Sequence, residues 1–473
     1  MVAWFKNYYL HLSLVIFGFI LRIINIANPK KFSMDEVWYV PDGYSMFKNG
    51  YEVRWLKSYN GDWTKELQAM FVSGNLEPYD LSYISTHPPF GKFLIGLGML
   101  FFEPTNPFGW RIASVIFGST IIALSMVLAY LLFKNKTVSL LAGLFIAIDP
   151  AMIAMSKTAM LDIFLTAFVL AGMIFVIKYV NTFKIKYLFI IGIFFGLASA
   201  IKLSGVFFFL STLLFISIKL LYDKKFKNIL SLFFVTTSTL LLTYVLTWSS
   251  WFINYAFKQN ENPIWIFVKT HYVTLTDAKN IISSHPYKTS AIEWLWLARP
   301  TGLSVNNTSS EYVYSMPNVF FWFAGIASLI GVLVFLVRKK LDYNVSLLLF
   351  AVLAGWLPWV FVGNRTIFEF YIVAFLPYIF ISLAGFGYIC YILAKSEILK
   401  KIIRISLLFC MFFTVLLYPT AVGIPIPENN LLFKNIPAAY METVKQYGLY
   451  NTQQSEPLSS SEKTSSNISE SEK

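Results

Sequence analysis

Two adjacent acids, Asp35 and Glu36, follow the first apolar segment of the 473-residue chain. A carboxylate near a bilayer can act as a general base for a hydroxyl group when partial burial and nearby cations adjust its pKa. Adjacent acids ahead of an apolar run are also typical of a helix N-terminus, with Ser33 or Asp35 as the N-cap residue. The pair therefore indicates either a catalytic carboxylate or the start of a helix.

A second motif, His87-Pro88-Pro89-Phe90-Gly91-Lys92, lies later in the same segment. Its two prolines favour an extended turn that presents His87, and Lys92 falls on the helix that follows. Arg111 then begins the next apolar segment. An arginine at a helix N-terminus is suited to bind phosphate, so Arg111 is the first candidate for such a contact, with Lys92 and Arg365 as lesser candidates.

Charged side chains in or beside apolar segments are costly to place in a membrane and are therefore candidates for function. The eight such residues are Arg22, Arg111, Asp149, Lys157, Asp162, Lys202, Arg365 and Glu369. They could reach the headgroups or pair with one another, as Lys157 could with Asp162. Because most of them lie toward the same side of the membrane, we favour an outward-facing pocket that holds an anionic group.

Further polar groups lie in the second long loop, where His285 precedes Pro286-Tyr287 and Arg299 precedes Pro300. The sequence contains no GxxxxGK[ST] phosphate loop, no HExxH zinc motif and no GxSxG nucleophile motif. Nucleotide hydrolysis, zinc proteolysis and that class of serine hydrolase therefore have no support.

The composition shows what kind of element must position these groups. Hydrophobic residues make up 57% of the chain and charged residues only 13%, against roughly 25% charged residues in soluble domains. The chain is therefore expected to be an all-α polytopic protein of the lipid bilayer. Its net charge of +13 would suggest nucleic acid in a soluble chain, but here cytoplasmic loops explain it better, and nucleic acid is not an expected partner.

Apolar runs near the length of about 20 residues that a spanning helix needs occur eleven times. The predicted spans are 10–27, 109–133, 137–155, 159–178, 187–201, 203–221, 229–248, 318–337, 344–362, 366–391 and 402–420. With the N-terminus inside, the inner segments hold 17 basic residues and three acidic ones. This bias predicts an N-in, C-out topology, with long external segments at 28–108 and 249–317 and an active site that faces the outside of the plasma membrane.

The chain is expected to form one multi-span domain over residues 1–420. The short apolar run 90–102 is predicted to be a re-entrant or juxtamembrane helix, because it is too short to span. An external segment is expected at 421–450, followed by a Ser-rich tail at 451–473 whose composition predicts disorder.

Several of these motifs occur in a fixed order between residues 30 and 380. They are Asp35-Glu36, His87-Pro88-Pro89-Phe90-Gly91-Lys92, Gly109-Trp110-Arg111, Met160-Leu161-Asp162, His285-Pro286-Tyr287, Trp294 through Arg299-Pro300, and Arg365-Thr366 with Phe368 and Tyr371. Together they resemble the protein O-mannosyltransferases of glycosyltransferase family 39, in their bacterial or archaeal branch. The eleven-span, N-in, C-out GT-C fold of that family agrees with the charge pattern. Lys157 stands where the family commonly has Arg, so the charge remains and the bidentate geometry is lost.

The resemblance implies an inverting glycosyltransferase that moves mannose from a polyprenyl (dolichyl) phosphate carrier to Ser or Thr hydroxyls of secreted or membrane proteins. Asp35 would be the base and Glu36 would support it. The substrate-binding residues would be Arg111, His87, Lys92, Asp162, Lys157, His285, Arg299 and Arg365. No cofactor is required by this chemistry, because a phosphate held by cations is a good leaving group, although the Asp-Glu pair could hold a divalent cation.

Two other functions remain open from the sequence. A GT-C transferase could deliver the sugar to a lipid or a cell-envelope glycan instead of a protein. A transporter or flippase would be expected to show inverted repeats and charges across the whole membrane depth, and neither is found.

Overall fold

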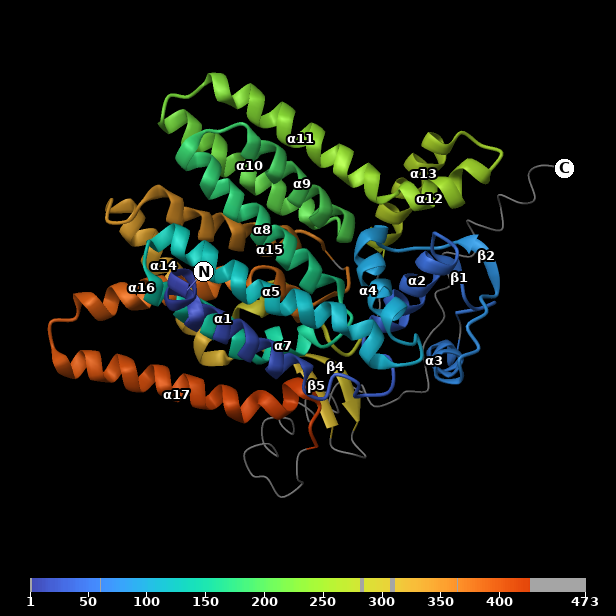
Figure 1. Cartoon of the computed structure of the whole chain (residues 1–473), viewed down its shortest axis with the longest axis horizontal. Coiled ribbons are helices and arrows are strands. Elements are labelled where there is room, and N and C mark those ends of the chain that lie inside the picture. The colour runs from blue at the N-terminus through green and yellow to red at the C-terminus, as the bar shows by residue number, and fades with distance from the viewer. Residues whose placement is uncertain (1, 60, 281–284, 307–310, 364, 426–473) are drawn as a thin grey trace.

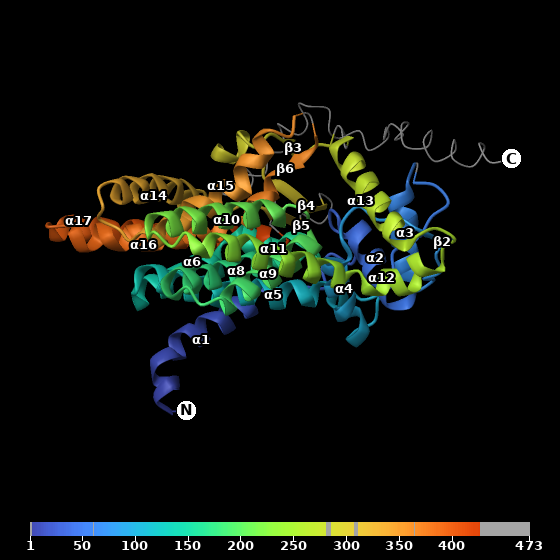
Figure 2. The ribbon, with the colours of Figure 1, turned by 90° about the horizontal axis from the view of Figure 1, so that it is seen from above.

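The computed structural model describes residues 2–59, 61–280, 285–306, 311–363 and 365–425. The predicted external segment 421–450 lies outside the described residues from position 426 onward, and the predicted tail 451–473 lies wholly outside them. The described chain is mainly helical. Long helices run alongside one another, and shorter elements gather at one end of the bundle (Figures 1 and 2).

The bundle is built from long apolar helices and one short helical continuation. They are α1 (Val2–Ile23), α5 (Pro107–Phe133), α6 (Lys136–Ile148), α7 (Pro150–Ser156), α8 (Leu161–Thr182), α9 (Lys186–Ile201), α10 (Gly205–Tyr222), α11 (Lys227–Thr247), α14 (Val319–Val337), α15 (Leu347–Val360), α16 (Leu376–Leu393) and α17 (Glu397–Val422). In Figure 1, α9, α10 and α11 lie along one edge of this bundle and α17 lies along the other.

Each predicted span overlaps one of these helices. Among the described residues, eight helices are long and apolar enough to cross a membrane, and the bent pair α6–α7 brings the number to nine. Two further predicted spans correspond to the shorter apolar helices Tyr8–Ile23 and Lys186–Ile201. The chain is thus an integral membrane protein. The prediction for 366–391 was wrong near its start, because residues 367–374 form strand β6 (Ile367–Phe368) and the 3-10 turn η4 (Glu369–Ala374), and the helix begins only at Leu376.

The predicted span 137–155 is bent by 62° where α6 meets α7. Pro150 cannot continue the hydrogen bonding of α6 and instead begins α7. The Asp149 carboxylate caps the new helix by accepting from the Met152 N–H at 3.0 Å, and its other oxygen accepts from the Asn318 N–H at 2.9 Å. Asp149 is therefore a structural residue at a helix break.

Burial distinguishes the centre of the bundle from its lipid-facing side. Within an apolar stretch of 18 residues in α8, 83% is buried inside the protein, whereas in the corresponding stretch of α11 only 22% is buried. Asp162 lies in the first turn of α8, so it projects from the most enclosed helix of the bundle.

Residues 28–108, called the first external segment after the predicted topology, form a compact unit at one end of the bundle. It contains α2 (Glu36–Lys48), α3 (Trp63–Ser73), α4 (Pro89–Phe101) and the antiparallel pair β1 (Val53–Arg54) and β2 (Asp80–Tyr83). Helix α4 confirms the helix predicted at 90–102 and packs against α2 and α5. This unit places Asp35, at the N-terminus of α2, beside the ends of the bundle helices.

Residues 249–317, called the second external segment after the predicted topology, return to the bundle through a short sheet. This segment comprises α12 (Ser249–Asn254), η1 (Ala256–Lys258), α13 (Pro263–Asn280), β3 (Lys288–Thr289), η2 (Glu293–Trp296) and the antiparallel pair β4 (Thr301–Asn306) and β5 (Glu311–Ser315). Strand β3 pairs antiparallel with β6, with Thr289 opposite Ile367. This pairing holds the loop after His285 against the turn that carries Arg365.

Candidate active site

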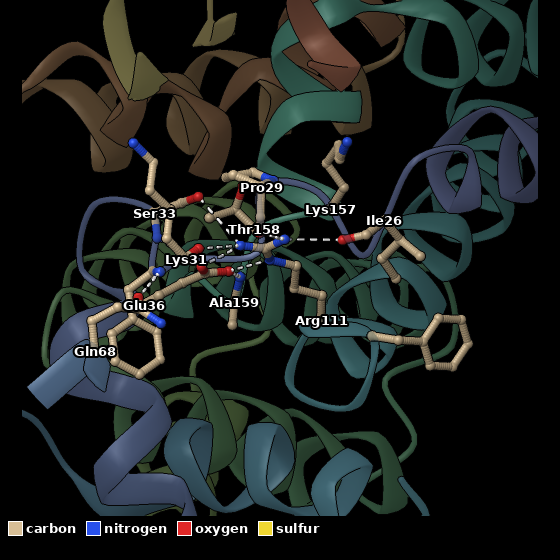
Figure 3. A network of polar contacts seen from close by, with 12 residues as sticks. Ile26, Pro29, Lys31, Ser33, Glu36, Gln68, Arg111, Lys157, Thr158 and Ala159 are labelled. Carbon is tan, nitrogen blue, oxygen red and sulfur yellow. Dashed lines mark hydrogen bonds and ion pairs between the residues drawn. The ribbon is translucent and has the colours of Figure 1, made fainter. Parts of the chain in front are cut away.

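The carboxylate of Glu36 and the guanidinium of Arg111 form a buried ion pair at the start of α2 (Figure 3). Arg111 Nε donates to Glu36 Oε1, and Arg111 Nη2 donates to Glu36 Oε2, both at 2.7 Å. The same carboxylate accepts from the backbone N–H groups of Ala159 and Ser33, both at 2.8 Å. The contact with Ser33 resembles half of a capping box, so the helix-start interpretation is correct for Glu36.

The remaining N–H groups of Arg111 hold the backbone that leads from α1 to α2. They donate to the carbonyl groups of Ile26, Pro29 and Lys31, each at 3.0 Å, and Nη2 also lies 3.3 Å from Ser33 Oγ. The side chain is 1% exposed. Arg111 therefore has no N–H group left for a donor phosphate, in contrast to its predicted role, and it shapes the loop that presents Asp35.

Asp35 is the N-cap residue of α2, yet its side chain makes no capping hydrogen bond. Among the described residues, its carboxylate accepts from one side chain, the Tyr39 hydroxyl, at 3.2 Å. Burial raises the pKa of Asp35 to about 6, and the nearby Lys202 cation opposes part of that rise. Asp35 is thus half-buried, and its carboxyl group has a pKa closer to neutral pH than that of an ordinary aspartate.

Lys202 and Asp162 form a second buried ion pair next to Asp35. Lys202 Nζ lies 3.0 and 3.1 Å from the two oxygens of Asp162, and it sits 4.1 Å from the ring centroid of Tyr371. The alternative pair of Lys157 with Asp162 is therefore wrong, because Lys202 occupies that carboxylate. The site therefore contains the two acids Asp35 and Asp162, a cation that pairs with Asp162 near Asp35, and an aromatic ring in contact with that cation.

His87 and Arg365 complete the group of side chains around Asp35. The His87 ring lies 5.9 Å from the Tyr39 ring. Burial, followed by the cations Lys202, Lys92 and Arg365, lowers the pKa of His87 well below its usual range, so His87 is neutral. Arg365 lies over the Trp359 ring at 5.5 Å, and within the described part of the chain its buried Nε atom has no hydrogen-bond partner.

Lys92 is held in a buried cluster of the first external segment. Its Nζ lies 2.7 Å from Glu52 Oε1 and 3.3 Å from Asp42 Oδ2, and it also bonds Ser85 Oγ. The side chain is fully buried. Lys92 therefore links α2, α4 and the β1–β2 pair. Because its ammonium group is bound by these protein partners, the structure does not support the predicted contact with phosphate.

Lys157 also binds the protein itself. Its Nζ donates to the carbonyl group of Asn25 at 2.9 Å and to that of Val422. These contacts tie the end of α7 to the ends of α1 and α17, so Lys157 stabilises the packing of these three helices.

His285 and Arg299 line a cavity of about 560 Å³ between the second external segment and the turn after α15. Arg365 and Trp359 also line this cavity. The His285 Nδ1 atom accepts from the Tyr287 N–H at 3.2 Å, and burial lowers the pKa of His285 to about 4. Arg299 Nη1 donates to the Lys288 carbonyl group at 2.7 Å, which fixes the edge of β3.

The described residues offer little to a metal ion. No group of three or more His, Cys, Asp or Glu side chains converges in them. Glu36 has both oxygens bonded to protein donors, so Asp35 and Glu36 do not fit the suggested divalent cation site. That transfer needs no cofactor stays a prediction.

Sequence reasoning missed Tyr39, Tyr371 and the direct role of Lys202. Tyr39 is four residues after Asp35 on the same helix, a spacing that brings two side chains together, so that signal was available. Tyr371 was noticed only as part of a motif. Lys202 was noticed as a membrane charge without a partner.

The fold is that of the GT-C membrane glycosyltransferases. The *S. cerevisiae* protein O-mannosyltransferase Pmt1-Pmt2 complex bound to the sugar donor matches with a TM-score of 0.68 at 14% identity, over 89% of this chain and 91% of that one. ArnT from *Cupriavidus metallidurans* bound to undecaprenyl phosphate matches with a TM-score of 0.51 at 14% identity, over 88% and 74% of the two chains.

The chain belongs to the dolichyl-phosphate-mannose-protein mannosyltransferase family, whose sequence profile matches residues 12–275. It is therefore a glycosyltransferase. A polyprenol-phosphate-mannose–protein mannosyltransferase from *Corynebacterium glutamicum* is 25% identical over 74% of this chain and 76% of its own length. Its namesake from *Mycolicibacterium smegmatis* is 23% identical over 73% and 80%.

Proposed function

We propose that this chain transfers mannose from a polyprenyl-phosphate carrier to a Ser or Thr hydroxyl group of a protein. The observation that carries the proposal is the contrast between two neighbouring acids. Glu36 is fully bonded within the protein, whereas Asp35 is half-buried and has a pKa of about 6. The names of the actinobacterial relatives support the donor and the protein acceptor.

Asp35 acts as the general base in a single displacement. It takes the proton of the acceptor hydroxyl group while the hydroxyl oxygen forms a bond to C1 of the mannose. The bond between C1 and the phosphate oxygen breaks, and its electron pair leaves with the polyprenyl phosphate. One displacement of this kind inverts the configuration at C1. Tyr39 holds one carboxylate oxygen, which leaves the other to face the acceptor.

The departing phosphate is bound by Arg365, with Lys202 nearby. Arg365 is half-buried, lines the 560 Å³ cavity and has a buried Nε atom without a partner among the described residues. Lys202 keeps its pairing with Asp162 and adds positive charge beside Asp35. A preorganised cation stabilises charge that develops on a leaving group, so these two side chains favour cleavage. His87, His285, Asp162 and Arg299 shape the surrounding pocket.

The reaction takes place at the outer face of the plasma membrane. The excess of basic residues in alternate loops supports this side for the segment that carries Asp35. The proposed acceptors are therefore secreted or membrane proteins after they leave the cytoplasm.

The test is incubation of the purified protein in lipid nanodiscs with labelled polyprenyl-phosphate-mannose and a Ser/Thr-rich peptide. We expect the peptide to gain the mass of one hexose per modified hydroxyl group. A Glu77→Gln variant, altered at an exposed acid, serves as the control and should retain activity. Label that enters lipid or glycan but never peptide would contradict the protein acceptor and favour the lipid or cell-envelope alternative.

A further inference from the structure

Helix α13 carries a second apolar face that the rest of the described chain leaves exposed. The residues of this apolar face are Ile264, Trp265, Val268, Tyr272 and Leu275. Each of their side chains is between 50% and 71% exposed. Their successive spacings of one, three, four and three residues place them on one side of an α-helix over about three turns.

A neighbouring face of α13 is already packed against the protein. The Phe267 ring stacks on Phe252 at 5.2 Å, and the His271 ring lies 4.9 Å from Trp248. His271 Nε2 also lies 2.7 Å from the Tyr244 hydroxyl oxygen of α11. The apolar face is therefore not needed to dock the helix, and its exposure requires a separate explanation.

We propose that α13 lies in the outer interface of the membrane and inserts this apolar face among the lipid headgroups and upper acyl chains. Helix α13 follows α11 in the chain after only α12 and η1, and α11 presents a lipid-facing surface on which Leu242 and Leu246 are both 61% exposed. Trp and Tyr are enriched at such interfaces because their rings are amphipathic. Figure 2 shows α13 at a steep angle to the bundle helices, the orientation of a surface-lying helix.

A polar strip beside the apolar face gives α13 a side for water. Lys269 and Thr276 are exposed and lie one helical turn after Trp265 and Tyr272 respectively. A helix with one face on protein, one apolar face and one polar strip is suited to a boundary between lipid and water.

Helix α13 also lines a small cavity near the site. His271 and Thr274 of α13 line this cavity together with His87 and Leu203. The membrane contact of α13 would therefore fix the position of the residues that face His87 across this cavity. The membrane contact itself is independent of which sugar or acceptor the protein uses.

The test is spin-label accessibility in the full-length protein in nanodiscs. Cys390 and Cys410 are first replaced with Ser to remove the native thiols. Single labels are then attached at Val268→Cys and Tyr272→Cys on the apolar face, with Lys269→Cys and Thr276→Cys as matched controls on the polar strip. Relaxation by lipid-soluble oxygen and by a water-soluble nickel chelate reports the surroundings of each label.

We expect oxygen to dominate at positions 268 and 272 and the nickel chelate to dominate at 269 and 276. Dominance of the nickel chelate at all four positions would overturn the proposal, because the face would then be in water. Labels at 268 and 272 shielded from both reagents would also overturn it, because protein, such as a second copy, would cover the face. Neither result depends on transferase activity, so failure here is distinguishable from failure of the proposed reaction.

Discussion

Replacement of Arg111 with Ala should disrupt the folded state, with any loss of donor binding as a consequence. The substitution removes every hydrogen bond that the guanidinium makes to Glu36, Ser33 and the carbonyl groups of residues 26, 29 and 31. It leaves the Glu36 carboxylate, which is fully buried, without its cation. The loop that presents Asp35 would lose its main anchor.

The expected loss of unfolding free energy is large because the Arg111–Glu36 ion pair is buried. Removing one partner of a buried ion pair costs about 3–5 kcal/mol, since the other charge stays unpaired. Arg111→Lys should recover little, because an ammonium group has three donors and cannot reproduce the planar fork that meets both oxygens of Glu36. The double variant Arg111→Met/Glu36→Met should lose an unfolding free energy that differs by about 1–3 kcal/mol from the sum of the losses in the two single variants. Such a difference is expected when two residues interact directly.

Thermal unfolding of the purified variants measures this effect, together with binding of the labelled donor at a temperature where each variant is still folded. Arg338→Ala, at an exposed arginine after α14, is the matched control and should unfold like the parent protein. A normal unfolding temperature for Arg111→Ala combined with weakened donor binding would refute the structural role. That result would restore the phosphate contact predicted from the sequence.

Three further predictions concern the proposed reaction. The transfer rate should fall as the pH drops below about 6, because the pKa of Asp35 is raised to about 6 and the base is active only when deprotonated; a rate unchanged between pH 7 and 5 would exclude this base. Tyr39→Phe removes the hydroxyl that donates to the Asp35 carboxylate, so the half-maximal pH of the rate profile should move upward, and an unmoved profile would show that this bond does not act on the base. Arg365→Gln should weaken donor binding about tenfold or more while the unfolding temperature changes little, because a charged hydrogen bond contributes about 1.5–3 kcal/mol; unchanged donor affinity would remove Arg365 from the phosphate site.

The sequence was sufficient to locate the bundle helices because lipid demands long apolar runs. It could not resolve where such a run stops being helical. Residues 367–374 are apolar enough to be read as part of a span, yet they form β6 and a 3-10 turn because β6 pairs with β3 from a distant loop. Long-range pairing of that kind leaves no local signal.

The structure separates the two acids of the pair. Glu36 is bonded to the backbone at the helix start, whereas the Asp35 carboxylate accepts from the Tyr39 hydroxyl, and its role as the catalytic base stays a prediction. The sequence could not assign these roles, because they depend on Arg111, which approaches from 75 residues away.

The sequence also could not show which partner each basic side chain binds. A basic side chain beside a membrane is equally compatible with phosphate and with backbone carbonyl groups. Lys157 meets the carbonyl group of Val422, 265 residues further along the chain, and Arg111 meets a loop that precedes it by about 80 residues. Only the folded structure shows which cation retains an unpaired donor, and within the described residues Arg365 Nε is such a donor.

The central claim is that the Asp35 carboxylate removes the proton of the acceptor. Its most direct test is the rate at which Asp35→Asn transfers mannose from labelled polyprenyl-phosphate-mannose to a Ser/Thr-rich peptide, measured with donor binding and unfolding temperature in the same preparation. We predict that transfer falls by about 10²–10⁴-fold while donor binding and unfolding temperature stay near those of the parent protein. A transfer rate close to that of the parent protein would contradict the account.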